Sequence, residues 1–469
     1  MRLGKQVVSW GESTFIQNSI NAINPVDAAA FRRPGAEIKE GLIPVNMFFV
    51  SQSLTENLSA EAFYQLEWDQ TVIDNCGTFF AQADVAADGC TDNLRLLTNN
   101  LAVGNAVNTA LAGSGLEIEQ NSEGTLARRG PDRDARDDGQ WGLALRYMFA
   151  PLDTEFGLFA MNYHSRTPNI SVTSPAQSVY NAAAQAGAAA PLVVGGNSRY
   201  FLEYPEDIRL YGLSFATTLP TGTAWQGEVS YRPNAPVQMT TTDVLFAAVG
   251  PLADLSPAFA AFGNASVLDG APDTDIHGYR RKEITQLQTT FTHFFDQVMG
   301  AGRVTLIGEL GWTHVGGLES TREARYGRDP VFGPGPLPAT GPANTCRALN
   351  QSTLAGAVGN GNFENLTKNC VDDGYVTTTS WGYRARVIWD YSDVFAGVNL
   401  KPSISWSHDV DGYGPNGLFN EGAKAVSLGL DAEYDSAYTA SLSYTDFFGG
   451  DFNTSIDRDF VALSFGVNF

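Results

Sequence analysis

DRDFVALSFGVNF, residues 457–469, is the stretch of this chain that decides the fold. From Val461 to Phe469, large apolar residues alternate with small or polar ones, a period of two that predicts a strand with one apolar face. An amphipathic strand with an aromatic last residue rarely ends a soluble protein. It commonly ends an outer-membrane β-barrel, where the apolar face meets lipid. The ending alone leaves an outer-membrane barrel and a soluble sandwich evenly balanced.

The composition of the 469 residues looks soluble, with 43% hydrophobic and 17% charged residues and a mean hydropathy of -0.14. No window offers the roughly 18 uninterrupted apolar residues of a membrane-spanning helix. The nearest candidate, residues 244–262, is interrupted by Gly250, Pro251 and Pro257. A helical membrane protein is therefore excluded, whereas a barrel hides its hydrophobicity in alternation. The net charge of -22 argues against nucleic-acid binding.

About 14 strands follow from the same period of two. The clearest hairpin lies between Val45 and Thr71, where Leu58 and Leu66 face one way and Glu61 and Gln65 the other. Further strands are predicted near residues 3–9, 141–149, 155–165, 208–219, 225–232, 283–294, 304–315, 381–391, 398–407, 426–434, 438–444 and 461–469.

The connections between these strands alternate in length. Short turns are expected at 54–57, 150–154, 220–223, 295–302, 391–395 and 434–437. Long loops are expected at 72–138, 167–205, 233–278 and 316–377. A sandwich has no reason for such alternation, but a transmembrane barrel has short periplasmic turns and long extracellular loops. The fold class is therefore all-β, a transmembrane antiparallel barrel formed by a single domain over residues 1–469.

The start of the chain lacks the signal peptide that an outer-membrane protein needs, and a predicted strand follows Met1 directly. We expect residues upstream to be missing. Up to four further strands there would bring the total to about 18.

Aromatic residues lie near many of the predicted strand ends, where they would form the interfacial girdles of a barrel. They are Trp68, Trp141, Tyr147, Trp225, Tyr231, Trp381, Tyr391 and Trp406. Ordinary sheet aromatics are the alternative.

Charged residues fall on the polar faces of the strands. An ionised Arg or Lys facing lipid at mid-depth would cost about 2–4 kcal/mol, so we expect these residues to line the lumen. Cross-linking of the barrel wall by ion pairs is one role for them, and lining a substrate path is the other. The candidates for that path are Arg384, Arg386, Arg146, Glu228, Arg232, Glu61 and Glu67, with Arg384 and Arg386 foremost.

Catalytic and metal motifs are missing from the sequence, and we expect no enzyme and no cofactor. The five histidines are scattered, and neighbours in Ser407-His408-Asp409 would point to opposite faces of a strand, which rules out a triad. An acidic run at 132–138 is ordinary solvated surface or, alternatively, a site for calcium or for divalent bridging to lipopolysaccharide.

The four cysteines form two sequence-local pairs. Cys76 with Cys90 and Cys346 with Cys370 are the expected disulfides among three formal pairings. Disulfides indicate an oxidising compartment such as the periplasm or cell surface. Zinc binding is the alternative, although neither pair has CxxC spacing.

Three loop segments read as helices. They are 91–111, the alanine-rich stretch after Ser174-Pro175 with Ser174 as its cap, and 244–249 with Asp243 as its cap. Such apolar helices suit a lid, a plug or a docking site, and packing of loop against loop is the alternative.

The opening of the chain resembles a known family. RLGKQVVSWGES (residues 2–13), NAINPVD (21–27), FRRPGAE (31–37), FYQLEW (63–68) and CGTFF (76–80) are similar to the proteobacterial outer-membrane proteins catalogued as domain of unknown function 1302. The resemblance implies a barrel often encoded beside a periplasmic lipoprotein-carrier-like protein and an inner-membrane exporter of the resistance-nodulation-division type. It also implies a loop at 24–34 after the first strand, folded inward or forming a plain turn.

These patterns together predict an outer-membrane barrel of a Gram-negative bacterium that takes part in transporting hydrophobic or amphipathic molecules. The alternatives are a diffusion porin for small polar solutes and a surface structural or adhesion protein. The expected partners are outer-membrane lipid and lipopolysaccharide, the barrel assembly machinery, and the carrier and exporter that the family resemblance implies. Phe465, Val467 and Phe469 would be the assembly signal.

Overall fold

The main element of the computed structural model is a sheet of 14 strands in which every neighbouring pair is antiparallel. The structure describes residues 1–32, 37–91, 93–98, 101–122, 124–260, 262–336 and 370–467. In sheet order the strands are β1 (Arg2–Gln6), β2 (Val45–Ser53), β3 (Leu58–Gln65), β8 (Trp141–Phe149), β9 (Thr154–Tyr163), β12 (Ile208–Thr218), β13 (Ala224–Gln238), β15 (Tyr279–Asp296), β16 (Arg303–Gly316), β17 (Thr379–Phe395), β18 (Val398–Asp411), β19 (Lys424–Tyr434), β20 (Tyr438–Phe448) and β21 (Phe460–Val467).

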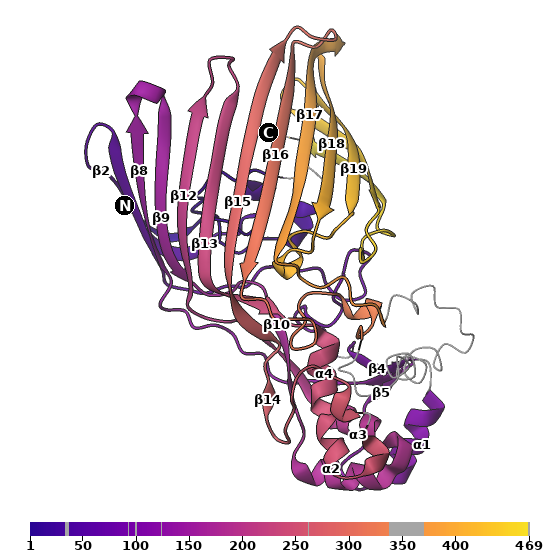
Figure 1. Ribbon diagram of the computed structural model, residues 1–469. Helices are drawn as coiled ribbons and strands as arrows, with labels where there is room; N and C mark the ends of the chain where they lie inside the picture. The colour runs from indigo at the N-terminus through magenta and orange to yellow at the C-terminus, as the bar shows by residue number, and fades with distance from the viewer. Residues whose placement is uncertain are drawn as a thin grey trace.

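The sheet is strongly curved, and Figure 1 shows it as an open wall. Its strand number and antiparallel order confirm the prediction. Among the described residues, however, β1 pairs with β2 alone and β21 with β20 alone. The expected closed barrel is therefore not formed by these 14 strands.

Long and short connections lie at opposite ends of the strands, as predicted. Figure 1 shows the short turns at the top and the long connections, with their helices, below. One turn differs from expectation: β17 continues to Phe395, and Ala396 and Gly397 make the turn with φ of 50° and 83°. Within the turn expected at 391–395, Ser392 and Asp393 instead lie at an irregularity in the pairing between Tyr391 and Phe395, with Asp393 at a φ of 50°.

The two faces of the sheet have inverted polarity. On the convex face large apolar side chains are exposed, and on the concave face polar side chains are buried. Leu66 is 46% exposed and its neighbour Gln65 is 1% exposed. Other buried residues of the concave face are Ser214, Ser230, Gln286, Gln288, Thr290, Thr313, Ser380, Ser405, Ser427 and Thr445. The predicted facing of the strands is thus confirmed.

Aromatic side chains form rows on the convex face. Near the short turns, one row crosses five neighbouring strands through Tyr147, Phe156, Phe215, Trp225 and Phe291. In this row the Trp225 ring lies 4.8 Å from Phe215 and is stacked 5.8 Å from Phe291, measured between centroids.

At the other end of the strands Trp312 and Trp381 are register partners. Trp68 does not join a row, because it lies beyond the end of β3 and packs against Tyr204.

In the described part of the long connections lie four helices: α1 (Leu101–Leu111), α2 (Gln177–Ala183), α3 (Ala190–Asn197) and α4 (Thr241–Val249). Short strands beside them form two small sheets, one of β4 (Arg95–Thr98), β5 (Gln120–Asn121) and β6 (Gly124–Leu126), the other of β7 (Arg128–Arg129), β10 (Asn169–Thr173), β11 (Arg199–Glu203) and β14 (Asp275–Ile276). Single turns of 3-10 helix are η1 (Ala28–Phe31), η2 (Ile38–Gly41), η3 (Ala150–Leu152), η4 (Ala184–Ala189), η5 (Gly250–Asp254), η6 (Pro257–Phe259), η7 (Phe262–Asn264), η8 (Pro330–Phe332) and η11 (Pro415–Gly417).

The helices pack against one another, loop on loop. Their shared core includes Tyr180 of α2, Val194 of α3 and Val249 of α4. No helix within the described ranges is long and apolar enough to cross a membrane.

Two predicted caps are wrong. The Ser174 hydroxyl bonds to the carbonyl oxygens of Ala271 and Thr274 instead of capping α2. Asp243 lies in the first turn of α4 and forms a fully buried ion pair with Arg325.

Candidate functional site: the interior of the sheet

The connection from β1 to β2 begins with residues 7–24, which fold into the concavity of the sheet; we call them the inner segment. Its Trp10 is 1% exposed and lies against Phe63 and Phe159, with centroids 5.1 and 5.8 Å apart. The Trp10 indole Nε1 donates to Glu61 Oε2 at 2.7 Å. Figure 1 shows indigo N-terminal chain inside the curve of the wall. This inward course precedes the loop at 24–34, for which the family resemblance implied an inward fold or a plain turn, and shares only Asn24 with it.

Two buried carboxylates hold the middle of the inner segment. Glu309 of β16 accepts the backbone N–H groups of Thr14, Phe15 and Ile16 at 2.9, 2.7 and 2.7 Å. Each of these hydrogen bonds is charge-assisted, and the three N–H donors together allow an ionised carboxylate to be buried. The sequence places Glu309 on a polar face but carries no local signal that it binds backbone 294 residues away.

Glu228 of β13 has the same role on the adjoining part of the inner segment. It accepts the Ser13 hydroxyl at 2.7 Å, the Ile20 N–H at 3.2 Å and the Glu12 N–H. Gln288 Nε2 donates to it from β15 at 3.2 Å. This predicted path residue therefore anchors the inner segment.

The other predicted path residues lie at different places. Arg146 is 3.0 Å from Glu155 and lies over the Phe159 ring, so it cross-links the wall. Glu61 accepts the hydrogen bond from the Trp10 indole. Glu67 lies beyond the end of β3. Three remain on cavity walls: Arg232, Arg384 and Arg386.

A wide cavity of about 790 Å³ opens between the inner segment, β17–β20 and the rim loops. Its wall combines apolar and aromatic side chains, among them Phe15, Ile16 and Phe419, with polar ones. Arg384 and Asp409 on this wall form a 2.7 Å ion pair. The ring of the neighbouring His408 packs against Tyr383, with the ring centroids 5.6 Å apart.

A second cavity of about 320 Å³ lies on the other side of the inner segment; we call it the arginine cavity because Arg166 and Arg232 line it. The two cavities share Gln17, Asn18, Gln238, Asn416 and Leu418 as lining residues. They therefore adjoin each other.

Arg386 borders a small gap of about 30 Å³ among the last strands. The other polar side chains around it are Ser403, Ser405, Ser427, Asp431, Ser441 and Ser443. The wall of β18–β20 is thus rich in hydroxyl groups.

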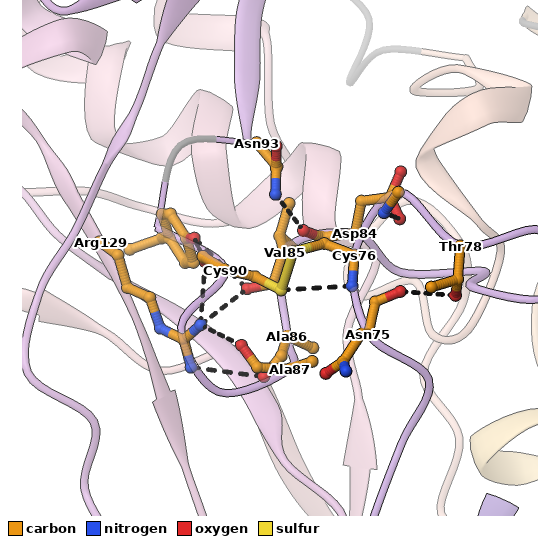
Figure 2. The surroundings of a disulfide bond; sticks show 12 residues. Asn75, Cys76, Thr78, Asp84, Val85, Ala86, Ala87, Cys90, Asn93 and Arg129 are labelled. Carbon is orange, nitrogen blue, oxygen red and sulfur yellow. Dashed lines mark hydrogen bonds between the residues drawn. A yellow bond between two sulfur atoms is a disulfide. The ribbon is translucent and has the colours of Figure 1, made fainter.

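The Cys76–Cys90 disulfide is confirmed and lies in a rim loop (Figure 2). Arg129 Nη1 donates to the carbonyl oxygens of Ala87 and Cys90 at 2.8 and 3.0 Å, which organises the stapled loop. Residues 82–85 of this loop line the wide cavity. Zinc binding by this pair is thereby ruled out.

Two predictions, the second disulfide and the assembly signal, fall partly outside the described residues. Cys346 lies outside them, so its pairing with Cys370 stays a prediction. Phe465 and Val467 lie on β21 with exposed side chains, and Phe469 is not among the described residues.

The acidic run at 132–138 is largely engaged by protein groups. Asp132 pairs with Arg129 at 2.6 Å and Asp138 with Arg136 at 3.0 Å, while Asp137 accepts the Trp68 N–H. Across the described ranges, no group of three or more histidine, cysteine or carboxylate side chains could hold a metal ion.

Comparison with known proteins gives one full-length match. The model of the family described as "Protein of unknown function (DUF1302)" matches residues 1–469. No curated protein matches the chain.

Several solved structures show a weak likeness. The ferric enterobactin receptor PfeA of Pseudomonas aeruginosa has a TM-score of 0.32 at 11% identity over 85% of this chain, which spans 41% of the receptor. A FadL homologue of the same organism has a TM-score of 0.30 at 11% identity over 87% of this chain and 71% of its own. The siderophore receptor PirA of Acinetobacter baumannii has a TM-score of 0.30 at 10% identity over 90% of this chain and 54% of its own. TM-scores this low carry no inference about function.

Proposed function

We propose, on the premise that this chain belongs to the family described as protein of unknown function DUF1302, that it forms the wall of an outer-membrane β-barrel in a Gram-negative bacterium. We propose further that it takes part in transporting hydrophobic or amphipathic molecules across the envelope. The observation that carries the proposal is the inverted polarity of the 14-stranded sheet, with its apolar face outward and its polar face buried.

The convex face is what a lipid bilayer would solvate. Leu143, Leu158, Leu213 and Leu428 are each at least half exposed, and each lies on a different strand. Burying such a side chain stabilises by about 1.5–3 kcal/mol, so a face repeating them over many strands favours lipid over water. The aromatic row near the short turns and the Trp312–Trp381 pair at the other end of the strands are typical of the girdles of membrane barrels.

The interior supports selective transport over free diffusion. The inner segment occupies the concavity, and the wide cavity beside it offers apolar and polar wall together, which suits a molecule with both characters. Arg384 and Arg386 are the wall residues that we assign to the path. The periplasmic carrier and the inner-membrane exporter are the partners we propose, with the barrel assembly machinery for insertion.

Reconstitution tests this function. The full chain, purified in detergent and placed in liposomes, should pass a fluorescent acyl-chain probe and exclude sucrose. Boiled and unboiled samples should migrate differently on a gel. Large, steady ohmic conductance together with sucrose flux would establish a diffusion porin instead. The absence of both flux and a deletion phenotype would favour a surface structural protein.

A further inference from the structure

Among the described residues, the wall of the arginine cavity contains no aspartate or glutamate, and Arg166 and Arg232 are its only charged side chains. Five asparagines contribute to its polar groups: Asn18, Asn21, Asn24, Asn169 and Asn416. The chain as a whole carries 51 acidic residues against 29 basic ones. The positive charge of this cavity is therefore opposite in sign to the net charge of the protein.

Arg232 is 7% exposed and is poorly satisfied for a buried cation. Its Nη2 donates to Gln286 Oε1 at 3.1 Å, and its Nε is buried without a hydrogen-bond partner in the described part of the chain. A guanidinium stays ionised and offers five donors. Burial of such a group is tolerated only when an anion or several acceptors meet it.

Arg166 is equally buried, and its bonds go to neutral oxygens. Its Nη1 donates to the Asp69 carbonyl at 2.7 Å, and its Nη2 to the Ile23 carbonyl and to the amide oxygens of Gln65 and Gln140. Its Nε is also buried without a partner among the described residues. Burial lowers the pKa of Arg166 to about 10, which still leaves it charged at neutral pH.

Three other arginines of the interior and rim each form an ion pair with a carboxylate. Arg325 pairs with Asp243, Arg384 with Asp409 at 2.7 Å and Arg129 with Asp132 at 2.6 Å. Within the described ranges neither Arg166 nor Arg232 has a carboxylate oxygen within ion-pair distance. The two cations facing the arginine cavity therefore lack the direct ion pair that these three arginines have, although the Asp69 carboxylate acts on Arg166 from further away.

We infer that the arginine cavity binds the anionic headgroup, a carboxylate or a phosphate monoester, of an amphipathic molecule. Arg232 bonds the anion, and Arg166 positions the wall and adds positive charge. The chain of the molecule extends past Asn18 and Asn416 into the adjoining wide cavity, against Phe15 and Ile16. The headgroup site stands on these contacts, and its place on a transport route rests on the proposed function.

The test is calorimetric titration of the full chain in a neutral maltoside detergent. The probes are decanoate, decyl phosphate, decanol and inorganic phosphate. We expect decanoate or decyl phosphate to bind at least tenfold more tightly than decanol and than inorganic phosphate, and the tighter of the two identifies the headgroup. Arg232→Gln should weaken that binding tenfold or more, since a hydrogen-bonded charge is lost, and Arg232→Lys should weaken it less.

Arg209→Gln is the matched control, because Arg209 is exposed on β12, one residue from the cavity residue Ile208. It should bind as the unsubstituted protein does. Equal binding by Arg232→Gln in protein that keeps its heat-modifiable migration, or equal affinity for decanol, would overturn the inference. Inorganic phosphate as tight as decyl phosphate would overturn the amphipath assignment. Binding without flux in liposomes would refute the proposed function alone, and flux without binding would refute this site alone.

Discussion

Glu309 and Phe15 meet through a single hydrogen bond of 2.7 Å from the Phe15 N–H to the Glu309 carboxylate, across 294 positions of sequence. The contact joins the wall to the inner segment, and the N–H groups of Thr14 and Ile16 complete it. Because the contact runs from a side chain of the wall to the backbone of the inner segment, a substitution of Glu309 alone would weaken it and leave the sequence of the inner segment unchanged.

We therefore expect Glu309→Gln to loosen the inner segment. Hydrogen bonds to a charged group contribute about 1.5–3 kcal/mol each, so removing the charge should lower the unfolding free energy by about 2–4 kcal/mol. In a planar bilayer the variant should show larger or more frequent conductance steps. Glu433→Gln, a substitution in β19, is the control. Conductance identical to that of the unsubstituted protein would contradict the anchoring role.

The facing of β20 can be tested with two neighbouring residues. Leu442 is exposed on the convex face, and Ser443 borders the gap on the concave face. Leu442→Arg should impair insertion, because Arg facing lipid near mid-depth costs about 2–4 kcal/mol. Ser443→Arg should insert normally, as measured by the yield of heat-modifiable protein in outer membranes. Equal yields would show that the convex face does not meet lipid.

Glu319, in the connection after β16, makes stability depend on pH. Burial raises the pKa of Glu319, but hydrogen bonds from Lys282 Nζ at 2.6 Å and the Tyr326 hydroxyl at 2.7 Å outweigh it and lower the pKa from 4.5 to about 2. A pKa lowered by folding means that the charged form stabilises the fold above pH 4.5 and that this stabilisation is lost as the pH falls toward 2.

The measurement is thermal unfolding of the protein and of Glu319→Gln between pH 7 and pH 3. The variant should melt at a lower temperature at pH 7, and the two melting temperatures should converge as the solution becomes acid. A difference that stays constant across this range would contradict the role of the Glu319 charge.

The Cys76–Cys90 disulfide should protect the rim loop and leave the wall unaffected. In the loop-closure account, a bridge spanning 14 positions stabilises by about 3 kcal/mol. Cys76→Ser combined with Cys90→Ser should accelerate proteolysis within residues 77–89, read by mass spectrometry. Heat-modifiable migration should persist, since the loop lies outside the 14 strands. Loss of that migration would mean that the loop is needed to build the wall.

The strands, their facing and the Cys76–Cys90 pair could be predicted because each signal is local. Period-two alternation identifies a strand wherever one face differs from the other, and a pair 14 positions apart is close before folding. Helix boundaries were predicted less accurately. The helix expected at 91–111 begins only at Leu101, and the residues before it include the strand β4, for which the sequence has no separate signal. In β17 the turn signal at Asp393 was outweighed by pairing that resumes at Phe395.

The interior could not be predicted in the same way. The partner of Asp243 is Arg325, 82 positions away, and Gln65 and Arg166 are 101 apart. Alternation places such residues on the inner face but says nothing of which one each will meet. Arg166 itself lies outside any strand, so no facing argument could find it.

The hydrogen bonds of the inner segment to the sheet go to strands from β1 to β16, and within the described residues none goes to β17–β20. The interior is therefore lopsided among the described residues, because the inner segment is hydrogen-bonded to one part of the wall and the wide cavity borders the other. A travelling molecule that followed this other part would pass Ser405, Ser427 and Ser443. These hydroxyl groups can only form hydrogen bonds with it, so the firmest holds on an acidic molecule would be Arg386 in their midst and the two arginines of the arginine cavity.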